Sequence, residues 1–206
     1  MTTGRVFVTG TDTDIGKTVV SAALTLGLDA YYWKPIQAGL TAATDTECVR
    51  RWTGLPRERF LPEAYRLREP MSPHAAAEIE GLEIDVDGIL ATSLPTDRPV
   101  VVEGAGGLMV PLTRHALMVD LIGRMSVPVI LVARTTLGTL NHTLLSLSEL
   151  RRRSIPVLGV VLNGEEHESN LRAIEEYGGV QVLGRVPPLA TIEAASLRGA
   201  FEALSL

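Results

Sequence analysis

The chain has 206 residues, with 46% hydrophobic and 21% charged side chains, and its formal net charge is −5 at pH 7. This composition is typical of a folded globular protein, and the acidic balance without basic runs argues against nucleic acid as the main partner. There is no membrane-length apolar run, no visible secretory leader and no second cysteine beside Cys48, so we expect no membrane partner and a cytoplasmic location.

Short apolar runs alternate along the chain with longer segments of helical periodicity. The runs predicted as strands are residues 5–9, 30–34, 99–103, 127–133, 157–162 and 180–186. The segments predicted as helices are residues 16–28, 44–53, 86–93, 116–125, 137–152, 169–177 and 192–204. Several strands are continuously apolar, as suits strands buried on both faces of a parallel sheet. The pattern predicts one α/β domain over residues 1–206, a parallel sheet flanked by helices on both faces.

Two regions of this predicted fold are candidates for a functional site. Ligands of such sheets bind at the carboxyl ends of the strands, so the residues that follow each strand are the first candidates. Residues 54–83 contain four prolines and are the least regular part of the chain, and we expect this segment to cover a site.

A glycine-containing loop joins the first predicted strand to the first predicted helix. Its sequence is Gly10-Thr11-Asp12-Thr13-Asp14-Ile15-Gly16-Lys17-Thr18-Val19. Backbone N–H groups at the start of a helix form an anion cradle, in which Lys17 would reach the β- and γ-phosphates and Thr18 would bind Mg²⁺. Five residues instead of four separate the first glycine from Gly-Lys-Thr, so the motif is a variant phosphate loop. It predicts a nucleoside-triphosphate site.

The sequence favours adenine as the base of this nucleotide. A guanine site would normally show an Asn-Lys-x-Asp motif late in the chain, whereas the fifth predicted strand ends in Asn163-Gly164 with no lysine. The amide of Asn163 can both donate to and accept from an adenine edge. Partition-type ATPases carry a second lysine near the start of the loop, and this loop has none.

Lysine is rare in this chain, because Lys17 and Lys34 are the only lysines among 19 basic residues. Base composition can produce such a bias, but a compact ammonium also fits among phosphates where a planar guanidinium does not. Lys34 directly follows the second predicted strand and therefore lies at the same sheet edge as the phosphate loop. It could neutralise charge that develops on a γ-phosphate; the alternative is a surface lysine after an edge strand.

Two acids complete the predicted site. Glu103 ends the third predicted strand and precedes Gly104-Ala105-Gly106, a position from which a carboxylate can hold Mg²⁺ and the backbone can approach phosphate. Asp45 follows the lysine segment and could complete the metal shell. The spacing leaves open an alternative, in which Asp45 is a capping acid of the helix that starts after Thr44.

Six motifs occur in the order and approximate spacing of one enzyme family. They are GTDTDIGKT, KPIQAG, TDTECV, EPMSPH, VEGAGG and LGTLNH. On these motifs the chain resembles the ATP-dependent dethiobiotin synthetases, and the resemblance extends over nearly the whole chain. It implies a phosphate-loop fold with a parallel sheet, in agreement with the pattern of strands and helices.

The resemblance also implies a reaction. Its substrates are 7,8-diaminononanoate, CO₂ and ATP, and its metal is Mg²⁺. One amine takes up CO₂ as a carbamate, which attacks the γ-phosphate of ATP to give a carbamic–phosphoric anhydride. The neighbouring amine then closes the cyclic urea of dethiobiotin, a step of biotin biosynthesis, and expels phosphate. No protein nucleophile is required, so positioning and charge neutralisation would supply the catalysis.

Matching the family's motifs to this chain implies roles for individual residues. The catalytic residues are Lys17 and Lys34, and the Mg²⁺ ligands are Thr18, Asp45 and Glu103. The nucleotide-binding residues are Thr13, Asp14, Ile15, Gly16, Lys17, Thr18, Val19, Asp45, Glu103, Gly104, Ala105, Gly106, Asn163, Gly164, Pro187, Pro188 and Leu189. The residues matched to the diamine substrate are Thr13, Lys34, Ala38, Gly138 and Asn141.

The far end of the substrate is implied to lie near a second copy of the chain. Gly138 and Asn141 open a predicted helix, whose N-terminus suits the substrate carboxylate, and in the family this carboxylate lies at a homodimer interface. The chain departs from the family at Ala38, where Ser or Thr is frequent, so a hydroxyl contact is missing or is supplied by Gln37 or Thr41. The roles of His74 and His142 stay open.

Two other functions compete with a cyclo-ligase. A small-molecule kinase would usually need an arginine-rich lid, for which Arg57, Arg59, Arg66 and Arg68 are the candidates. A nucleotide-gated switch or assembly ATPase would instead bind a partner tightly in one nucleotide state and turn over no small molecule.

Overall fold

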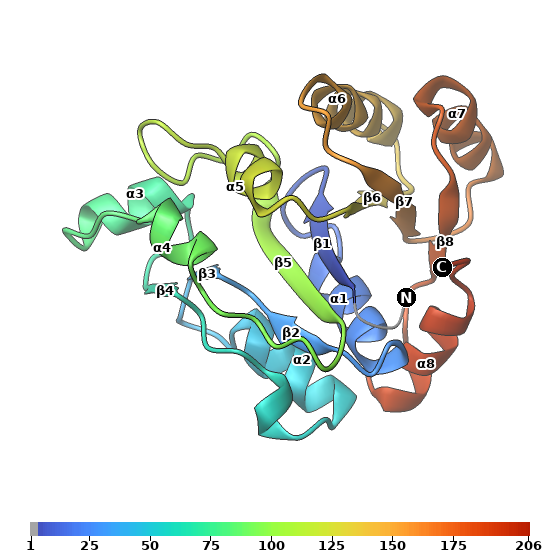
Figure 1. Cartoon of the computed structure of the whole chain (residues 1–206). Coiled ribbons are helices and arrows are strands. Elements are labelled where there is room, and N and C mark those ends of the chain that lie inside the picture. Colours follow the sequence, from blue (N-terminus) through green and yellow to red (C-terminus); the bar gives the residue numbers. More distant parts are fainter. Residues whose placement is uncertain (1–3) are drawn as a thin grey trace.

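A six-stranded parallel sheet forms the centre of the computed structural model, which describes residues 4–206 (Figure 1). Its order is β2-β5-β1-β6-β7-β8. The strands are β1 (Arg5–Gly10), β2 (Tyr31–Trp33), β5 (Val100–Gly107), β6 (Val129–Arg134), β7 (Val157–Asn163) and β8 (Val182–Val186). These are the six strands predicted from the sequence, with ends that differ by at most four residues. The predicted single domain includes residues 1–3, which lie outside the described residues.

Helices cover both faces of the sheet, as the continuous apolar runs predicted (Figure 1). On one face lie α1 (Lys17–Gly27), α2 (Asp45–Thr53) and α8 (Ala194–Glu202), and on the other lie α5 (Met118–Met125), α6 (Thr139–Arg152) and α7 (Glu168–Gly178). Side chains alternate along a strand, so β5 contributes to the cores on both faces of the sheet. Val101 packs on the face covered by α1, α2 and α8, whereas Val100 and Val102 pack on the face covered by α5. All three valines are fully buried.

The segment expected to be the least regular contains regular structure, which corrects that prediction. Residues 54–83 include the 3₁₀ turn Arg57–Arg59, strand β4 (Tyr65–Leu67) and helix α3 (Pro73–Ile79). Strand β4 pairs in parallel with β3 (Ile36–Ala38) in a second, two-stranded sheet. Three-residue strands are too short to show an alternating pattern, and Pro73 occupies the first helical position, where proline is tolerated.

The predicted helix at residues 86–93 is shorter than expected, because α4 spans Val86–Leu90. None of the helices in the described part of the chain has the length and apolar content that a membrane span requires.

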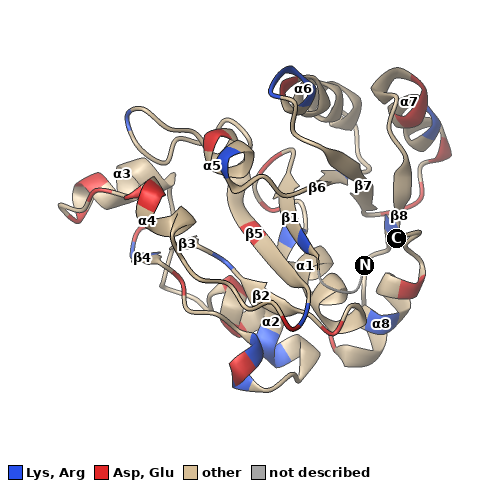
Figure 2. Cartoon of the chain, in the orientation of Figure 1, with Lys and Arg blue, Asp and Glu red and all other residues tan. Residues whose placement is uncertain are grey.

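The sheet order brings the chemically important strand ends together. β1 lies between β5 and β6, and β5 separates β1 from β2. The carboxyl ends of β1, β2 and β5 therefore meet at one edge of the sheet. One acidic segment lies within β5 (Figure 2). Glu103 is the acid in that strand.

Candidate functional site

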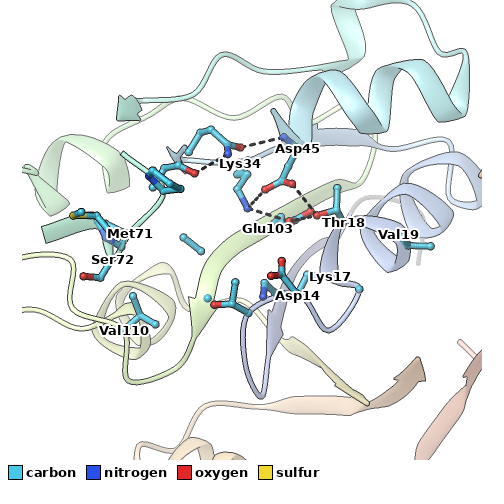
Figure 3. A pocket seen from close by; sticks show the side chains of 18 residues that line it. Asp14, Lys17, Thr18, Val19, Lys34, Asp45, Met71, Ser72, Glu103 and Val110 are labelled. Carbon is cyan, nitrogen blue, oxygen red and sulfur yellow. Dashed lines mark hydrogen bonds and ion pairs between the residues drawn. The ribbon is translucent and has the colours of Figure 1, made fainter. Parts of the chain in front are cut away.

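A cavity of about 690 Å³ opens at this edge of the sheet (Figure 3). Twelve of the residues predicted for the site line it, namely Thr13, Asp14, Gly16, Lys17, Thr18, Val19, Lys34, Ala38, Asp45, Glu103, Ala105 and Gly106. Gln37, Pro70, Met71, Ser72, Pro73 and Val110 complete the wall. Of the proline-containing segment that was expected to cover a site, residues 70–73 line this cavity.

A buried ion cluster lies at the base of this cavity (Figure 3). The Lys34 Nζ atom is 2.7 Å from Asp45 Oδ2 and 3.0 Å from Glu103 Oε1. The side chain of Lys34 is 5% exposed and that of Glu103 is fully buried. Lys34 is therefore no surface lysine, and the alternative considered from the sequence is excluded.

The acids control the charge state of Lys34. Burial alone would lower the pKa of this lysine, but attraction by Glu103 and Asp45 outweighs burial and raises the pKa. Burial would likewise raise the pKa of Asp45, yet its contact with Lys34 lowers it. Lys34 thus stays an ammonium ion. The pKa of Lys17 is lowered, chiefly by burial, although Glu103 acts in the opposite direction.

Three oxygen-bearing side chains meet beside the phosphate loop. Thr18 Oγ1 lies 3.1 Å from Asp45 Oδ1 and 3.0 Å from Glu103 Oε1, so its one hydroxyl hydrogen can be donated to either carboxylate. In the described residues no histidine, cysteine or further acid joins these two carboxylates to form a larger metal-ligand group. A hydroxyl and two carboxylates fit Mg²⁺, which keeps open positions for phosphate oxygens and water.

Asp45 is free for this contact because other residues cap its helix. Thr44 Oγ1 accepts from Glu47 N at 3.2 Å, and Thr44 N donates to Glu47 Oε2 at 2.9 Å. This reciprocal pair is a capping box. The alternative in which Asp45 serves as the capping acid is therefore wrong.

Tyr32 contacts the ion cluster and was missed in the sequence, and Gln37 was considered there only as a substitute for the missing hydroxyl at position 38. Tyr32 is fully buried, and its hydroxyl donates to Glu103 Oε2 at 2.9 Å. Gln37 Oε1 accepts from Asp45 N at 3.1 Å. The signal for Tyr32 was its spacing of two from Lys34, which places both side chains on one face of an extended segment.

Asn163 holds the phosphate loop through a hydrogen bond to its backbone. The amide Nδ2 of Asn163 donates to Ile15 O at 3.0 Å. Gly16 has a φ of 93°, and a Cβ added there would lie 2.2 Å from the same amide nitrogen. Only glycine fits this left-handed position beneath the loop. Lys17 Nζ donates to Asp12 O at 2.7 Å, so the lysine is held across its own loop.

Nine predicted residues lie outside the lining of the main cavity. They are Ile15, Gly104, Asn163, Gly164, Pro187, Pro188, Leu189, Gly138 and Asn141. Asn163 pairs in register with Val186, so the predicted adenine residues of β7 and the turn after β8 are neighbours. Gly138 caps α6 with a φ of 92°, and Asn141 is exposed in its first turn. Their roles toward nucleotide and substrate stay predictions.

The two histidines of open role lie elsewhere. His74 lines a separate cavity of about 290 Å³ together with His115 and Glu78. His142 is exposed on α6.

Comparison with known proteins identifies the relatives of this chain. A family model described as an AAA domain matches residues 4–196. The chain is 55% identical to the ATP-dependent dethiobiotin synthetase BioD of Rhodopseudomonas palustris (strain TIE-1), over 97% of this chain and 93% of that protein. Proteins of the same name from Nitrobacter hamburgensis and Brucella anthropi are 55% and 53% identical, over 96% and 94% of this chain and 92% and 91% of theirs.

Solved structures show the fold of a wider group. The septum site-determining protein MinD of Pyrococcus horikoshii, complexed with Mg-ADP, has a TM-score of 0.58 at 17% identity, over 97% of this chain and 86% of that chain. A ParA family ATPase of Chlorobium tepidum has a TM-score of 0.56 at 12% identity, over 98% and 90%. This likeness confirms the predicted phosphate-loop α/β fold.

The ion cluster predicts a pH-dependent loss of stability. Lys34→Met leaves two carboxylates without their cation, so the free energy of unfolding at neutral pH should fall by about 3–5 kcal/mol. In the wild type the folded-state pKa of Asp45 lies below its unfolded value. Its stabilising contribution is present above about pH 4 and is lost as the pH falls through the folded-state pKa. The variant lacks this contribution. The difference in unfolding free energy between wild type and Lys34→Met should therefore become smaller as the pH falls.

Urea unfolding at several pH values measures this deficit. The matched control is Arg114→Met, because the Arg114 side chain is 82% exposed in its ion pair with Glu78 and should cost less than about 1 kcal/mol. If Lys34→Met lowers the unfolding free energy by the same amount at neutral and acidic pH, the stabilising ion pair between Lys34 and Asp45 is contradicted.

Proposed function

The chain belongs to the ATP-dependent dethiobiotin synthetase family, and from this membership we propose that it converts 7,8-diaminononanoate, CO₂ and ATP into dethiobiotin, ADP and phosphate. It would thus be a cyclo-ligase of biotin biosynthesis. The observation that carries the proposal is the meeting of Lys17, Lys34, Thr18, Asp45 and Glu103 at one cavity. This set supplies compact cations for phosphate and oxygen ligands for Mg²⁺.

The proposed phosphate end is the loop between β1 and α1. The backbone N–H groups of residues 13–19 and the N-terminus of α1 would hold the β- and γ-phosphates, with Lys17 among them. Thr18, Asp45 and Glu103 would hold Mg²⁺, which when bound neutralises phosphate charge and orients the oxygens. Tyr32 keeps Glu103 in one orientation, since it engages Oε2 and leaves Oε1 toward the cavity.

The reaction proceeds in three steps in which the protein forms no covalent bond. An amine nitrogen of the substrate bonds to the carbon of CO₂ and loses a proton, which gives a carbamate. A carbamate oxygen bonds to the γ-phosphorus as the bond to ADP breaks, which gives the carbamic–phosphoric anhydride. The second amine then attacks the carbonyl carbon and loses a proton, the bond from that carbon to the phosphate oxygen breaks, phosphate leaves and the ring closes.

Lys34 is placed to act in the second step. Its ammonium group lies at the end of β2, across the cavity from the phosphate loop (Figure 3). A fixed cation there would offset the negative charge that grows on the transferring phosphoryl group and the carbamate. Because its acids hold it protonated and in place, this cation needs no rearrangement at the moment of reaction.

The proposed diamine site shares this cavity with the phosphate loop. Thr13, Lys34 and Ala38 line the cavity, as do Met71 and Ser72 from the loop before α3. Gln37 Nε2 donates to Ala38 O at 3.1 Å, so its amide is already engaged with backbone. The Ser72 hydroxyl therefore becomes the candidate to replace the hydroxyl that the family has at position 38.

The adenine end is proposed to lie at the neighbouring strand ends. Asn163 and Gly164 at the end of β7 lie beside Pro187, Pro188 and Leu189 after β8. The Asn163 amide nitrogen is engaged by Ile15 O, which leaves its carbonyl oxygen as an acceptor for the amino group of adenine.

A homodimer with the substrate near its interface is also part of the proposal. A second cavity of about 400 Å³ adjoins the main one and is lined by Leu108, Met109, Val110, Pro111 and Leu145. Met109 is 58% exposed and Leu145 is 62% exposed. Such exposed apolar side chains around a cavity are typical of an interface, and Gly138 and Asn141 lie on the same helix as Leu145.

Product analysis tests the reaction. Incubation with ATP, Mg²⁺, bicarbonate and 7,8-diaminononanoate should give the mass of dethiobiotin, with ADP formation that requires both the diamine and the carbon source. A phosphorylated diamine would instead indicate a kinase. ATP hydrolysis that does not depend on the diamine, with no ring-closed product, would rule the proposal out.

The two lysines predict a test of cation shape. Lys17→Arg and Lys34→Arg keep the charge but not the compact ammonium, so each should lower kcat at least about tenfold. The converse exchange at the surface, Arg172→Lys, is the matched control, because that side chain is 71% exposed. Steady-state turnover with circular dichroism as a folding check measures the effect. Near-normal turnover in either lysine variant would refute the need for a compact cation.

The interface predicts a change of oligomeric state. Leu145→Glu places a charge in the apolar cavity wall and should convert a dimer into a monomer in size-exclusion chromatography with light scattering. Tyr177→Glu is the control, since Tyr177 is 71% exposed on α7 and should leave the mass unchanged. A wild-type chain that is monomeric at micromolar concentration would contradict the dimer.

A further inference from the structure

Arg134, the last residue of β6, lies beside the phosphate loop. β1 and β6 pair in parallel with Gly10 opposite Val132, and Thr11 N continues the pairing by donating to Val132 O at 3.0 Å. Beyond this bond the two chain segments bring Asp12 and Arg134 side by side. The NH2 group of Arg134 donates to Asp12 Oδ2 at 2.7 Å.

Asp12 connects Arg134 to the proposed phosphate-binding groups. Its Oδ1 accepts from Thr13 N at 2.8 Å, and its backbone carbonyl accepts from Lys17 Nζ at 2.7 Å. One residue thus receives donors from the loop backbone, from the lysine of the loop and from the adjacent strand. Any movement of Asp12 would move the groups that contact phosphate.

The position of Arg134 is itself fixed by the start of α6. The hydroxyl of Thr139, a residue that is 1% exposed, donates to Arg134 O at 2.5 Å. The Nε atom of Arg134 is buried and makes no hydrogen bond within the described residues. Asp12 is therefore the partner that holds the guanidinium. The hydrogen bond from Thr139 fixes the backbone of Arg134, from which this side chain extends.

The charge of the loop gives this contact its importance. Residues 10–18 carry two carboxylates, Asp12 and Asp14, and one cation, Lys17. Without compensation such a loop would repel a polyanion at its own entrance. The side chains of Arg134 and Asp12 are 37% and 51% exposed, so their ion pair contributes little to stability. Its effect lies in the potential that a ligand meets.

We propose that Arg134 is a positioning residue of the phosphate loop, which offsets the charge of Asp12 and fixes its carbonyl against Lys17 so that the loop accepts a triphosphate. The inference rests on the proposed function in one respect, namely that this loop binds ATP. Arg134 need not touch the nucleotide to have this effect, because it acts through Asp12.

A double-mutant cycle on nucleotide affinity tests the inference. Arg134→Gln removes the cation and should raise the Kd for Mg-ATP roughly tenfold in isothermal titration calorimetry. Asp12→Asn keeps an oxygen acceptor for Thr13 N but removes the charge, so the double variant should return to within about threefold of wild type. The defect of Arg134→Gln should also narrow at high salt, because a charge effect is screened.

The outcomes show whether this inference, the proposed function or both have failed. Arg134→Lys is the conservative control, and it should keep most of the affinity because it keeps the charge. Wild-type affinity in Arg134→Gln, or a double variant as weak as Arg134→Gln, overturns the inference and leaves the proposed function intact. A wild-type chain that binds Mg-ATP but forms no dethiobiotin overturns only the proposed function, and one that binds no Mg-ATP overturns both.

Discussion

Neutralisation of buried charge is the constraint on which the rest of this structure depends. Lys34 and Glu103 are almost completely buried at the sheet edge, and an isolated ion in that place would cost several kcal/mol. Each must therefore bring a partner within hydrogen-bond distance, and Asp45 and Thr18 complete the set. These residues come from the end of β2 and from α2, β5 and α1, so the ion cluster forms only when these elements are correctly placed relative to one another.

The same constraint shapes what the cavity can bind. The cluster is balanced, because Lys17 and Lys34 face two carboxylates, and a ligand of one sign alone would disturb that balance. A triphosphate with its magnesium ion brings both signs at once, with the anion toward the lysines and the cation toward the acids. The balance between Arg134 and Asp12 extends this logic to the outer part of the loop.

Much of this site could be predicted from the sequence, for reasons that also explain the gaps. Lys17, Lys34 and Glu103 follow or end apolar strands, and parallel topology alone brings such positions to one edge. Tyr32 was missed because an aromatic residue within an apolar run indicates packing, and its hydroxyl becomes informative only when Glu103 is seen 2.9 Å away. The contact between Asn163 and Ile15 joins residues 148 positions apart, and no local pattern reports it. In the same way, β3 and β4 derive their regularity from pairing with each other.

The position of β5 between β1 and β2 has a consequence for how the site comes into being. The strands that precede the two lysines, β1 and β2, are made first, yet they do not touch in the finished sheet. The strand that joins them, β5, ends 74 residues after β2. While the chain is being synthesised, its first 99 residues therefore have a phosphate loop and a second lysine with no strand to hold them together. Insertion of β5 joins β1 to β2 and delivers Glu103 in the same event. The nucleotide site is thus an all-or-none property of the folded chain, and a partly made chain cannot hold its ligand in this way.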